Sequence, residues 1–149
     1  MQKQIYIGEA VATYKKGTTT KKDAPSIKGS KDGYELLKPF YMDEEDREAF
    51  SVIFLNRAHK VIFIEKMFTG GISATTVDVR LILKKALLNN ATSIIVSHNH
   101  PSGKLVPSEA DKRLTKKLKA AGDFMDITIL DHLIIGEDEY MSFADQGML

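Results

Sequence analysis

From residue 49 onward, apolar residues gather in short runs, and polar or glycine-containing stretches separate the runs. These runs are rich in β-forming residues and predict strands at residues 49–55 (AFSVIFL), 61–66 (VIFIEK), 91–97 (ATSIIVS), 126–136 and 139–143. The polar segment 56–60 joins the first two runs as a predicted hairpin.

Two longer segments carry helical rather than strand periodicity. Residues 76–90 place Val77, Leu81 and Leu88 on one helical face and end in two asparagines. A second helix is expected to begin after Ser108, with Leu114, Leu118 and Ala121 as its apolar face and Gly122 as its C-terminal stop. The order strand–helix–strand–helix–strand predicts an α/β sandwich with a mixed sheet.

Residues 1–43 have a different character and are set apart as an N-terminal region. Residues 4–14 (QIYIGEAVATY) predict one or two short strands, and residues 15–31 hold six lysines and read as a flexible basic loop. We favour a solvated linker there over a contact with an acidic partner. A short helix is expected next, with Ser30 as N-cap and a stop before Pro39; its apolar anchors are Tyr34, Leu36 and Leu37.

Composition narrows the class of protein. The chain has 149 residues, 43% of them hydrophobic and 28% charged, which is ordinary for one globular domain with its own core. A net charge of +1 gives no global attraction to nucleic acid or membrane, and no apolar stretch is long enough to span a bilayer. The chain has no cysteine and no secretory signal in residues 1–10, so a cytoplasmic location and no membrane contact are expected.

The densest chemistry lies in residues 97–111, SHNHPSGKLVPSEAD. His98 and His100 are two residues apart at the end of a predicted strand, so their side chains point to the same face. If Ser108 caps the next helix, Asp111 lies in its first turn and can turn its carboxylate toward the histidines. Two imidazoles and one carboxylate around one ion leave a fourth position open, which is typical of a catalytic zinc site.

Each part of this pattern also has an ordinary explanation. Two histidines can lie two apart by chance, and Ser-x-x-Asp is a common capping box. Joined at this spacing, after a buried strand and before a helix, they are more specific. His132 lies between apolar runs in LDHLIIG, where it either packs in the core or orients a group of the site; we favour packing. His59 lies in a turn and is expected to be exposed.

His-x-His, seven intervening residues and Ser-x-x-Asp resemble the signature of the JAMM (or MPN) metallopeptidases. The stretches SHNHPSG, PSEAD and LDHLIIG resemble the bacterial RadC family, which also has asparagine at the position of Asn99. The resemblance covers residues 44–149 and implies a short, JAMM-domain-only member. It implies a JAMM/MPN-like (cytidine-deaminase-like) three-layer sandwich with a mixed β-sheet.

The resemblance also implies an activity and roles for further residues. It implies a hydrolase of peptide or isopeptide (amide) bonds that uses one Zn²⁺ ion and acts on a peptide or protein. Glu48 matches the general acid/base of the relatives, and the alternative is a solvated charge beside Arg47. Ser108 matches the serine that hydrogen-bonds the substrate carbonyl oxygen.

Two other functions stay open. The predicted helix after Ser108 carries five basic residues that could meet phosphates: Lys112, Arg113, Lys116, Lys117 and Lys119. The family name implies DNA repair, so the alternative is an accessory, DNA-binding protein with a vestigial or structural metal site. The third hypothesis is an inactive scaffold. The sequence has no signal for an oligomeric state and no HExxH or Walker A motif.

Overall fold

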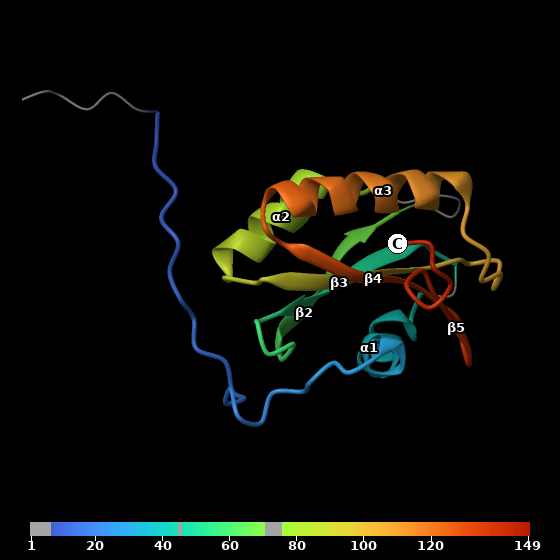
Figure 1. Ribbon diagram of the computed structural model, residues 1–149, viewed down its shortest axis with the longest axis horizontal. Helices are drawn as coiled ribbons and strands as arrows, with labels where there is room; N and C mark the ends of the chain where they lie inside the picture. Colours follow the sequence, from blue (N-terminus) through green and yellow to red (C-terminus); the bar gives the residue numbers. More distant parts are fainter. Residues whose placement is uncertain (1–6, 45, 71–75) are drawn as a thin grey trace, which may run out of the picture.

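The computed structural model describes residues 7–44, 46–70 and 76–149, and within them the chain forms three layers around one sheet (Figure 1). The strands are β1 (Ala49–Leu55), β2 (Val61–Thr69), β3 (Ser93–Asn99), β4 (Thr128–Ile135) and β5 (Tyr140–Ser142). The helices are α1 (Ser30–Leu37), a following 3-10 turn η1 (Lys38–Tyr41), α2 (Val79–Leu88) and α3 (Glu109–Phe124). Helices α2 and α3 cover one face of the sheet and α1 covers the other, which confirms the expected α/β sandwich.

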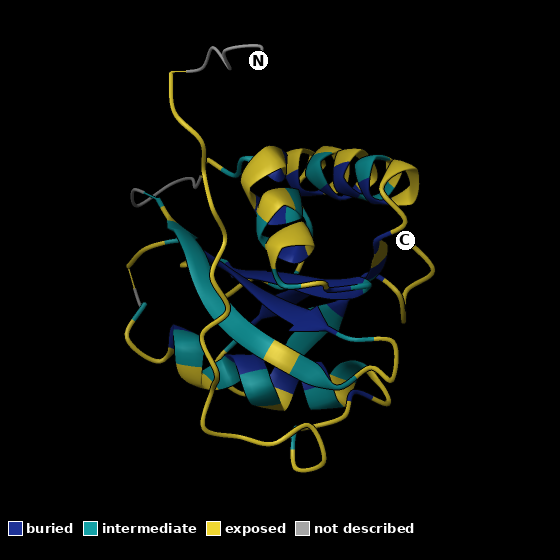
Figure 2. Cartoon of the chain, turned by 90° about the vertical axis from the view of Figure 1, so that its left-hand side faces the viewer, coloured by how far each residue is buried: buried dark blue, intermediate teal, exposed yellow. Residues whose placement is uncertain are grey.

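The sheet has the strand order β2-β1-β3-β4-β5 and is mixed, as expected. Strand β1 runs antiparallel to both β2 and β3, so the predicted hairpin is confirmed. Strands β3 and β4 are parallel and are joined through α3, while β4 and β5 are antiparallel. Every residue of β1 and β3 is buried, whereas the edge strand β2 is only partly covered (Figure 2).

Alternation along the strands divides the interior into two cores. On β3, Ile94 and Val96 face the layer of α2 and α3, and Ile95 faces α1. His98 continues the even-numbered series and therefore lies under α3 at the end of the strand. The α2–α3 core includes Phe50, Val52, Phe54, Ile82, Leu118 and Ile129.

The N-terminal strands predicted at residues 4–14 are wrong for the part that is described. Residues 4–6 lie outside the described residues, and residues 7–14 form no strand and no ladder with the sheet. Ile7, Val11 and Tyr14 are exposed, and this segment extends away from the body (Figure 1). Strand propensity depends on packing against a neighbouring strand, and the described residues offer this segment no such partner.

The N-cap of helix α1 lies one residue earlier than the sequence predicted. Its N-cap is Gly29 and not Ser30, whose hydroxyl instead contacts the Tyr140 hydroxyl at 2.8 Å and donates to Asp145 at 2.6 Å. The α-helix ends at Leu37, as the proline at position 39 requires, and Pro39 then opens the 3-10 turn. Tyr34 and Leu37 are buried against the sheet, so this helix is part of the core.

The other helices differ from expectation only near their ends. Helix α2 begins at Val79 and not at residue 76, because the Asp78 carboxylate caps it by accepting from the Arg80 amide. Helix α3 begins after Ser108 as predicted but continues past Gly122 to Phe124. No helix in the described part of the chain is both long and apolar enough to cross a membrane.

Gly122 is required for packing and not for ending the helix. A Cβ atom at this position would lie 2.5 Å from the Ile127 carbonyl oxygen and 3.1 Å from the Ile129 side chain. We expect Gly122→Ala to destabilise the fold by about 1–3 kcal/mol from overpacking, although alanine is intrinsically the better helix former by about 1 kcal/mol. Urea unfolding measures this, with the exposed Lys116→Ala as control; an unchanged or raised stability would contradict it.

Candidate metal centre

Three side chains meet where β3 ends and α3 begins. His98 lies at the end of β3 on the face covered by α3, and His100 follows directly after the strand. Asp111 lies in the first turn of α3 and is buried. The strand end and the helix start therefore bring together the three residues that the sequence predicted to converge.

The donor atoms of these residues are almost in contact. The Nε2 atoms of His98 and His100 are 2.9 Å apart. The Asp111 carboxylate places Oδ1 3.3 Å from His98 Nε2 and Oδ2 3.1 Å from His100 Nε2. Two nitrogen ligands of one tetrahedral zinc ion are about 3.3 Å apart. The three residues thus match the spacing of a single-ion site.

Glu48 joins this group from the position directly before β1, the strand that pairs with β3. Phe50 of β1 pairs with His98 of β3, so Glu48, two residues earlier, comes level with His100. Its Oε1 lies 3.9 Å from His98 Nε2, and one donor atom from each of the four residues lies within 4.8 Å of the others. The group of Glu48, His98, His100 and Asp111 could therefore hold a metal ion.

The neighbouring acidic residues are not equivalent to Glu48. The Glu44 carboxylate pairs with the Lys66 ammonium at 2.7 Å, on strand β2. Glu45 lies outside the described residues. Of the two described glutamates, the register of β1 against β3 brings only Glu48 into the group.

Asn99, between the two histidines, holds the segment that carries Glu48. Its side-chain oxygen accepts from the Ala49 amide at 2.8 Å, and its nitrogen donates to the carbonyl oxygens of Glu44 and Arg47 at 2.9 Å each. Asn99 points to the opposite face from His98, as alternation requires. One residue of the strand end thus ties down the backbone on both sides of Glu48.

Ser108 caps α3 and fixes Asp111. The Ser108 hydroxyl accepts from the Asp111 amide at 3.0 Å, and the Asp111 carboxylate accepts from the Ser108 amide at 2.8 Å. This reciprocal pair is the predicted capping box. Ser108 is exposed beside the group, and its hydroxyl proton is not used by the cap.

The contacts between Asp111 and the two histidines determine the ionisation of the Asp111 carboxyl. Burial by itself raises the pKa of the Asp111 carboxyl, but hydrogen bonds with His100 and His98 outweigh it and hold the pKa well below its usual range. The hydrogen bond with Asp111 is the main reason that the pKa of His100 is raised, against the opposing effect of burial. Asp111 therefore stays negative at neutral pH, which favours a cation at this place.

His132 is not merely a packed core residue, as the sequence interpretation favoured. It is fully buried, and its Nε2 lies 2.8 Å from His98 Nδ1. On its other side, His132 Nδ1 lies 2.6 Å from the hydroxyl of Thr115 in α3. Sequence reasoning did not find Thr115, although its position four residues after Asp111 places it on the same face of the helix.

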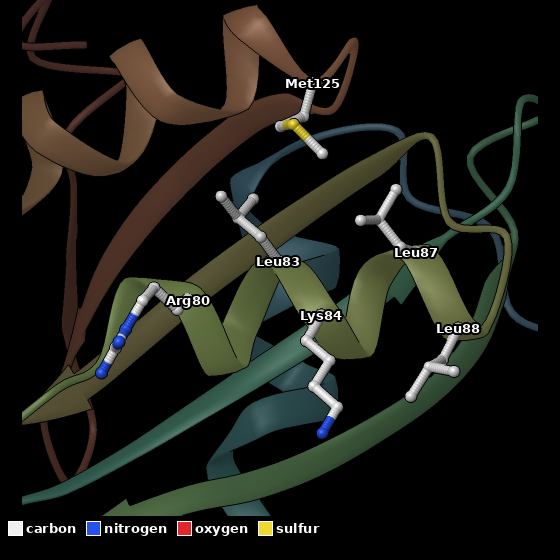
Figure 3. A pocket seen from close by; sticks show the side chains of 6 residues that line it. All are labelled: Arg80, Leu83, Lys84, Leu87, Leu88 and Met125. Carbon is white, nitrogen blue, oxygen red and sulfur yellow. The ribbon is translucent and has the colours of Figure 1, made fainter. Parts of the chain in front are cut away.

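A separate apolar groove lies at the far end of α3. There Met125 points toward Leu83 and Leu87 of α2 (Figure 3). Along the axis of α3 this groove is about 20 Å from Asp111, so it is not the pocket of the metal centre. Its lining residues are Arg80, Leu83, Lys84, Leu87, Leu88 and Met125.

The mixed sheet, the helices on its two faces and the donor group at the end of β3 are those of a JAB/MPN-like protein. The chain matches the RadC-like JAB domain over residues 27–148. This match covers most of the chain and includes α1, so the chain belongs to the RadC family of JAB-domain proteins.

Curated relatives agree with this assignment. A UPF0758 protein of Flavobacterium johnsoniae is 51% identical over 122 residues, which are 82% of this chain and 53% of the relative. UPF0758 proteins of Porphyromonas gingivalis and Actinobacillus succinogenes are 44% and 47% identical over 83% and 72% of this chain, and over 55% and 49% of their own lengths. The chain thus spans about half the length of the curated relatives that it matches.

Proposed function

We propose that this domain is a zinc-dependent hydrolase of peptide or isopeptide bonds, with a peptide or protein as its substrate. The observation that carries the proposal is the convergence of Glu48, His98, His100 and Asp111 at one strand end. Membership of a JAB-domain family points in the same direction. The alternative hypothesis is an inactive scaffold that keeps these residues only for stability, and it predicts that the protein hydrolyses no amide.

His98, His100 and Asp111 are the proposed ligands of one zinc ion. Two imidazole nitrogens and one carboxylate are a donor set that zinc accepts, and a fourth position stays open for water or substrate. When bound, zinc would supply an activated water at neutral pH, because it lowers the pKa of water that it coordinates to about 7.

Glu48 and Ser108 are the proposed catalytic residues that are not metal ligands. The Glu48 carboxylate lies on the rim of the group, where it can take a proton from the attacking water and pass it to the leaving amine. The exposed Ser108 hydroxyl can donate to the carbonyl oxygen as that oxygen gains charge. Neither residue is needed as a ligand in this proposal, so each can be removed without removing the metal.

Elemental analysis together with a substrate screen tests the proposal. Protein purified without added metal should contain one zinc ion per chain, and a panel of peptide and isopeptide substrates should include one that it hydrolyses. Chelator treatment should abolish that hydrolysis, and zinc should restore it. A protein that stays free of zinc when zinc is supplied, or a fully loaded protein that cleaves no amide, would refute the proposed activity.

Ser108→Ala should have two separable effects. Hydrolysis should fall by about 10²–10³-fold through loss of one donor to the carbonyl oxygen. The free energy of unfolding should fall by about 1 kcal/mol because the cap of α3 is lost. Ser108→Asp keeps an acceptor for the cap but no hydroxyl, so it should restore stability and not the rate. A Ser108→Asp variant with the wild-type rate would exclude this role.

A second candidate is an accessory protein that binds DNA, and one observation favours it. The solvent face of α3 exposes a cluster of basic side chains: Lys112, Arg113, Lys116 and Lys117. Two basic residues of α3 are partly neutralised, since Lys112 pairs with Glu109 at 3.1 Å and Lys119 with Asp123 at 3.5 Å. Binding of duplex DNA that weakens steeply with salt and is lost in Lys116→Glu/Lys117→Glu would favour this function.

A further inference from the structure

A chain of three hydrogen bonds leads from His98 back to the helix that presents Asp111. His98 Nδ1 lies 2.8 Å from His132 Nε2, and His132 Nδ1 lies 2.6 Å from Thr115 Oγ1. The Thr115 hydroxyl in turn donates to the Asp111 carbonyl oxygen at 2.7 Å. The chain therefore connects two of the proposed ligands through two buried side chains.

The chemistry of its last member sets the direction of every proton in this chain. A carbonyl oxygen only accepts, so the single hydroxyl proton of Thr115 points at Asp111. Thr115 Oγ1 must then accept from His132 Nδ1–H. A neutral His132 that carries its proton on Nδ1 has a lone pair on Nε2, and this lone pair accepts from His98 Nδ1–H. With its Nδ1 proton held by His132, His98 offers Nε2, which faces His100 and Asp111, as the nitrogen that can bind a metal ion.

The surroundings keep His132 neutral and its ring fixed. His132 is fully buried, and a buried ring without a charged partner favours the neutral imidazole. Its ring stacks on Phe143, with centroids 4.7 Å apart and planes within 10°, and meets Phe50 edge-on at 6.0 Å. These two ring contacts hold the His132 imidazole against His98.

His100 reaches the same state by a shorter route. Its Nδ1 lies 2.7 Å from the Lys104 carbonyl oxygen, which only accepts, so Nδ1 carries a proton and Nε2 is the nitrogen that can bind a metal ion. A backbone carbonyl thus orients one histidine. For His98, which is buried in the sheet, a pair of side chains does the same task.

We propose that Thr115 and His132 are positioning residues that hold His98 in the tautomer whose Nε2 can bind a metal ion. The consequence for metal binding rests on the proposed zinc site, whereas the tautomer itself does not. The reverse arrangement, with a proton on His132 Nε2, would place a proton on His98 Nε2 among the ligands. It would also require the one Thr115 proton to serve both His132 and Asp111.

Matched variants of Thr115 separate this role from packing. Thr115→Val keeps the shape and removes the hydroxyl, so it should weaken zinc binding by about 10–100-fold, as loss of a partner behind a ligand does. Thr115→Ser keeps the hydroxyl and should bind zinc like the wild type. Competition with a chromophoric chelator measures the affinity, and thermal unfolding shows that each variant is folded. Equal affinity of Thr115→Val and wild type would overturn the proposal.

Nitrogen-15 NMR of the imidazole rings tests the tautomer without a metal. At a pH of about 8, above the ordinary imidazole range, zinc-free wild type should carry protons on Nδ1 of both His98 and His132. His98 protonated on Nε2 in place of Nδ1 would overturn the proposal even if every variant failed to fold. A wild type that binds no zinc but shows the expected tautomers would refute the proposed zinc hydrolase and support Thr115 and His132 as positioning residues. The failure of one proposal is therefore distinguishable from the failure of the other.

Discussion

Replacing Glu48 by glutamine should leave the fold and the bound zinc in place while slowing amide hydrolysis by about 10²–10⁴-fold. Glutamine has nearly the same shape as glutamate, but its amide cannot take a proton from water and return it to a leaving amine. The Glu48 carboxylate is 3.9 Å from His98 Nε2, close enough to serve the open position without being required as a ligand. Steady-state rates check the loss of hydrolysis, and zinc content measured on the same preparation checks that the metal is retained.

Glu44→Gln is the matched control for this experiment. Glu44 is the neighbouring described glutamate, and its carboxylate is held by Lys66 at 2.7 Å and not by the metal group. Its substitution should lower stability by about 1–3 kcal/mol, because the pair is partly buried and one charged partner is lost, and should leave the rate unchanged. A Glu48→Gln enzyme that turns over substrate at the wild-type rate would exclude Glu48 as the proton carrier.

Loss of a ligand should have a larger effect, since it removes the metal and hence the activity. Asp111→Asn is the sharpest variant because its side-chain oxygen can still accept from the Ser108 amide and keep the capping box. The neutral amide is a poor ligand for zinc, and the negative charge of the site is lost. We expect dialysed Asp111→Asn to contain almost no zinc, to hydrolyse no substrate and to retain α3.

His98→Ala should also lose zinc, but less cleanly, because it removes one of the two hydrogen-bond partners of the buried His132. His59→Asn controls for the number of histidines. His59 is exposed in the β1–β2 turn at a φ of 56°, a backbone conformation that asparagine tolerates. This variant should keep one zinc ion per chain. Full zinc occupancy in Asp111→Asn or His98→Ala would show that the ligand assignment is wrong.

The parts that sequence reasoning predicted well depend on neighbours along the chain. Strand β1 and strand β3 are continuous apolar runs, and Ser108 with Asp111 forms a cap within four residues. His98 and His100 share a face because strand alternation is a local rule. The predicted convergence with Asp111 follows from these local rules plus one short loop.

Where local pattern and environment disagree, the environment decided. Residues 7–14 have the composition of a strand but no partner for their backbone groups among the described residues, so they are not one. Gly122 has the character of a helix stop, but the close approach of the Ile127 carbonyl is what requires glycine there. For residues 7–14 the missing contact is a neighbouring strand, and for Gly122 the contact is the Ile127 carbonyl oxygen. Both depend on the folded structure around the segment and not on its own sequence.

Tertiary structure alone decided which distant residues join the centre. Antiparallel pairing of β1 with β3 brings Glu48 level with His100; the family resemblance singled out Glu48, but hydrophobic pattern and propensity around residue 48 do not distinguish it from Glu44. Parallel pairing of β3 with β4 sets Val96 beside His132 and so places that imidazole behind His98, where Thr115 of α3 meets it. Helix and strand periods are determined by adjacent residues, but strand register is a long-range choice made by burying both faces of the sheet together.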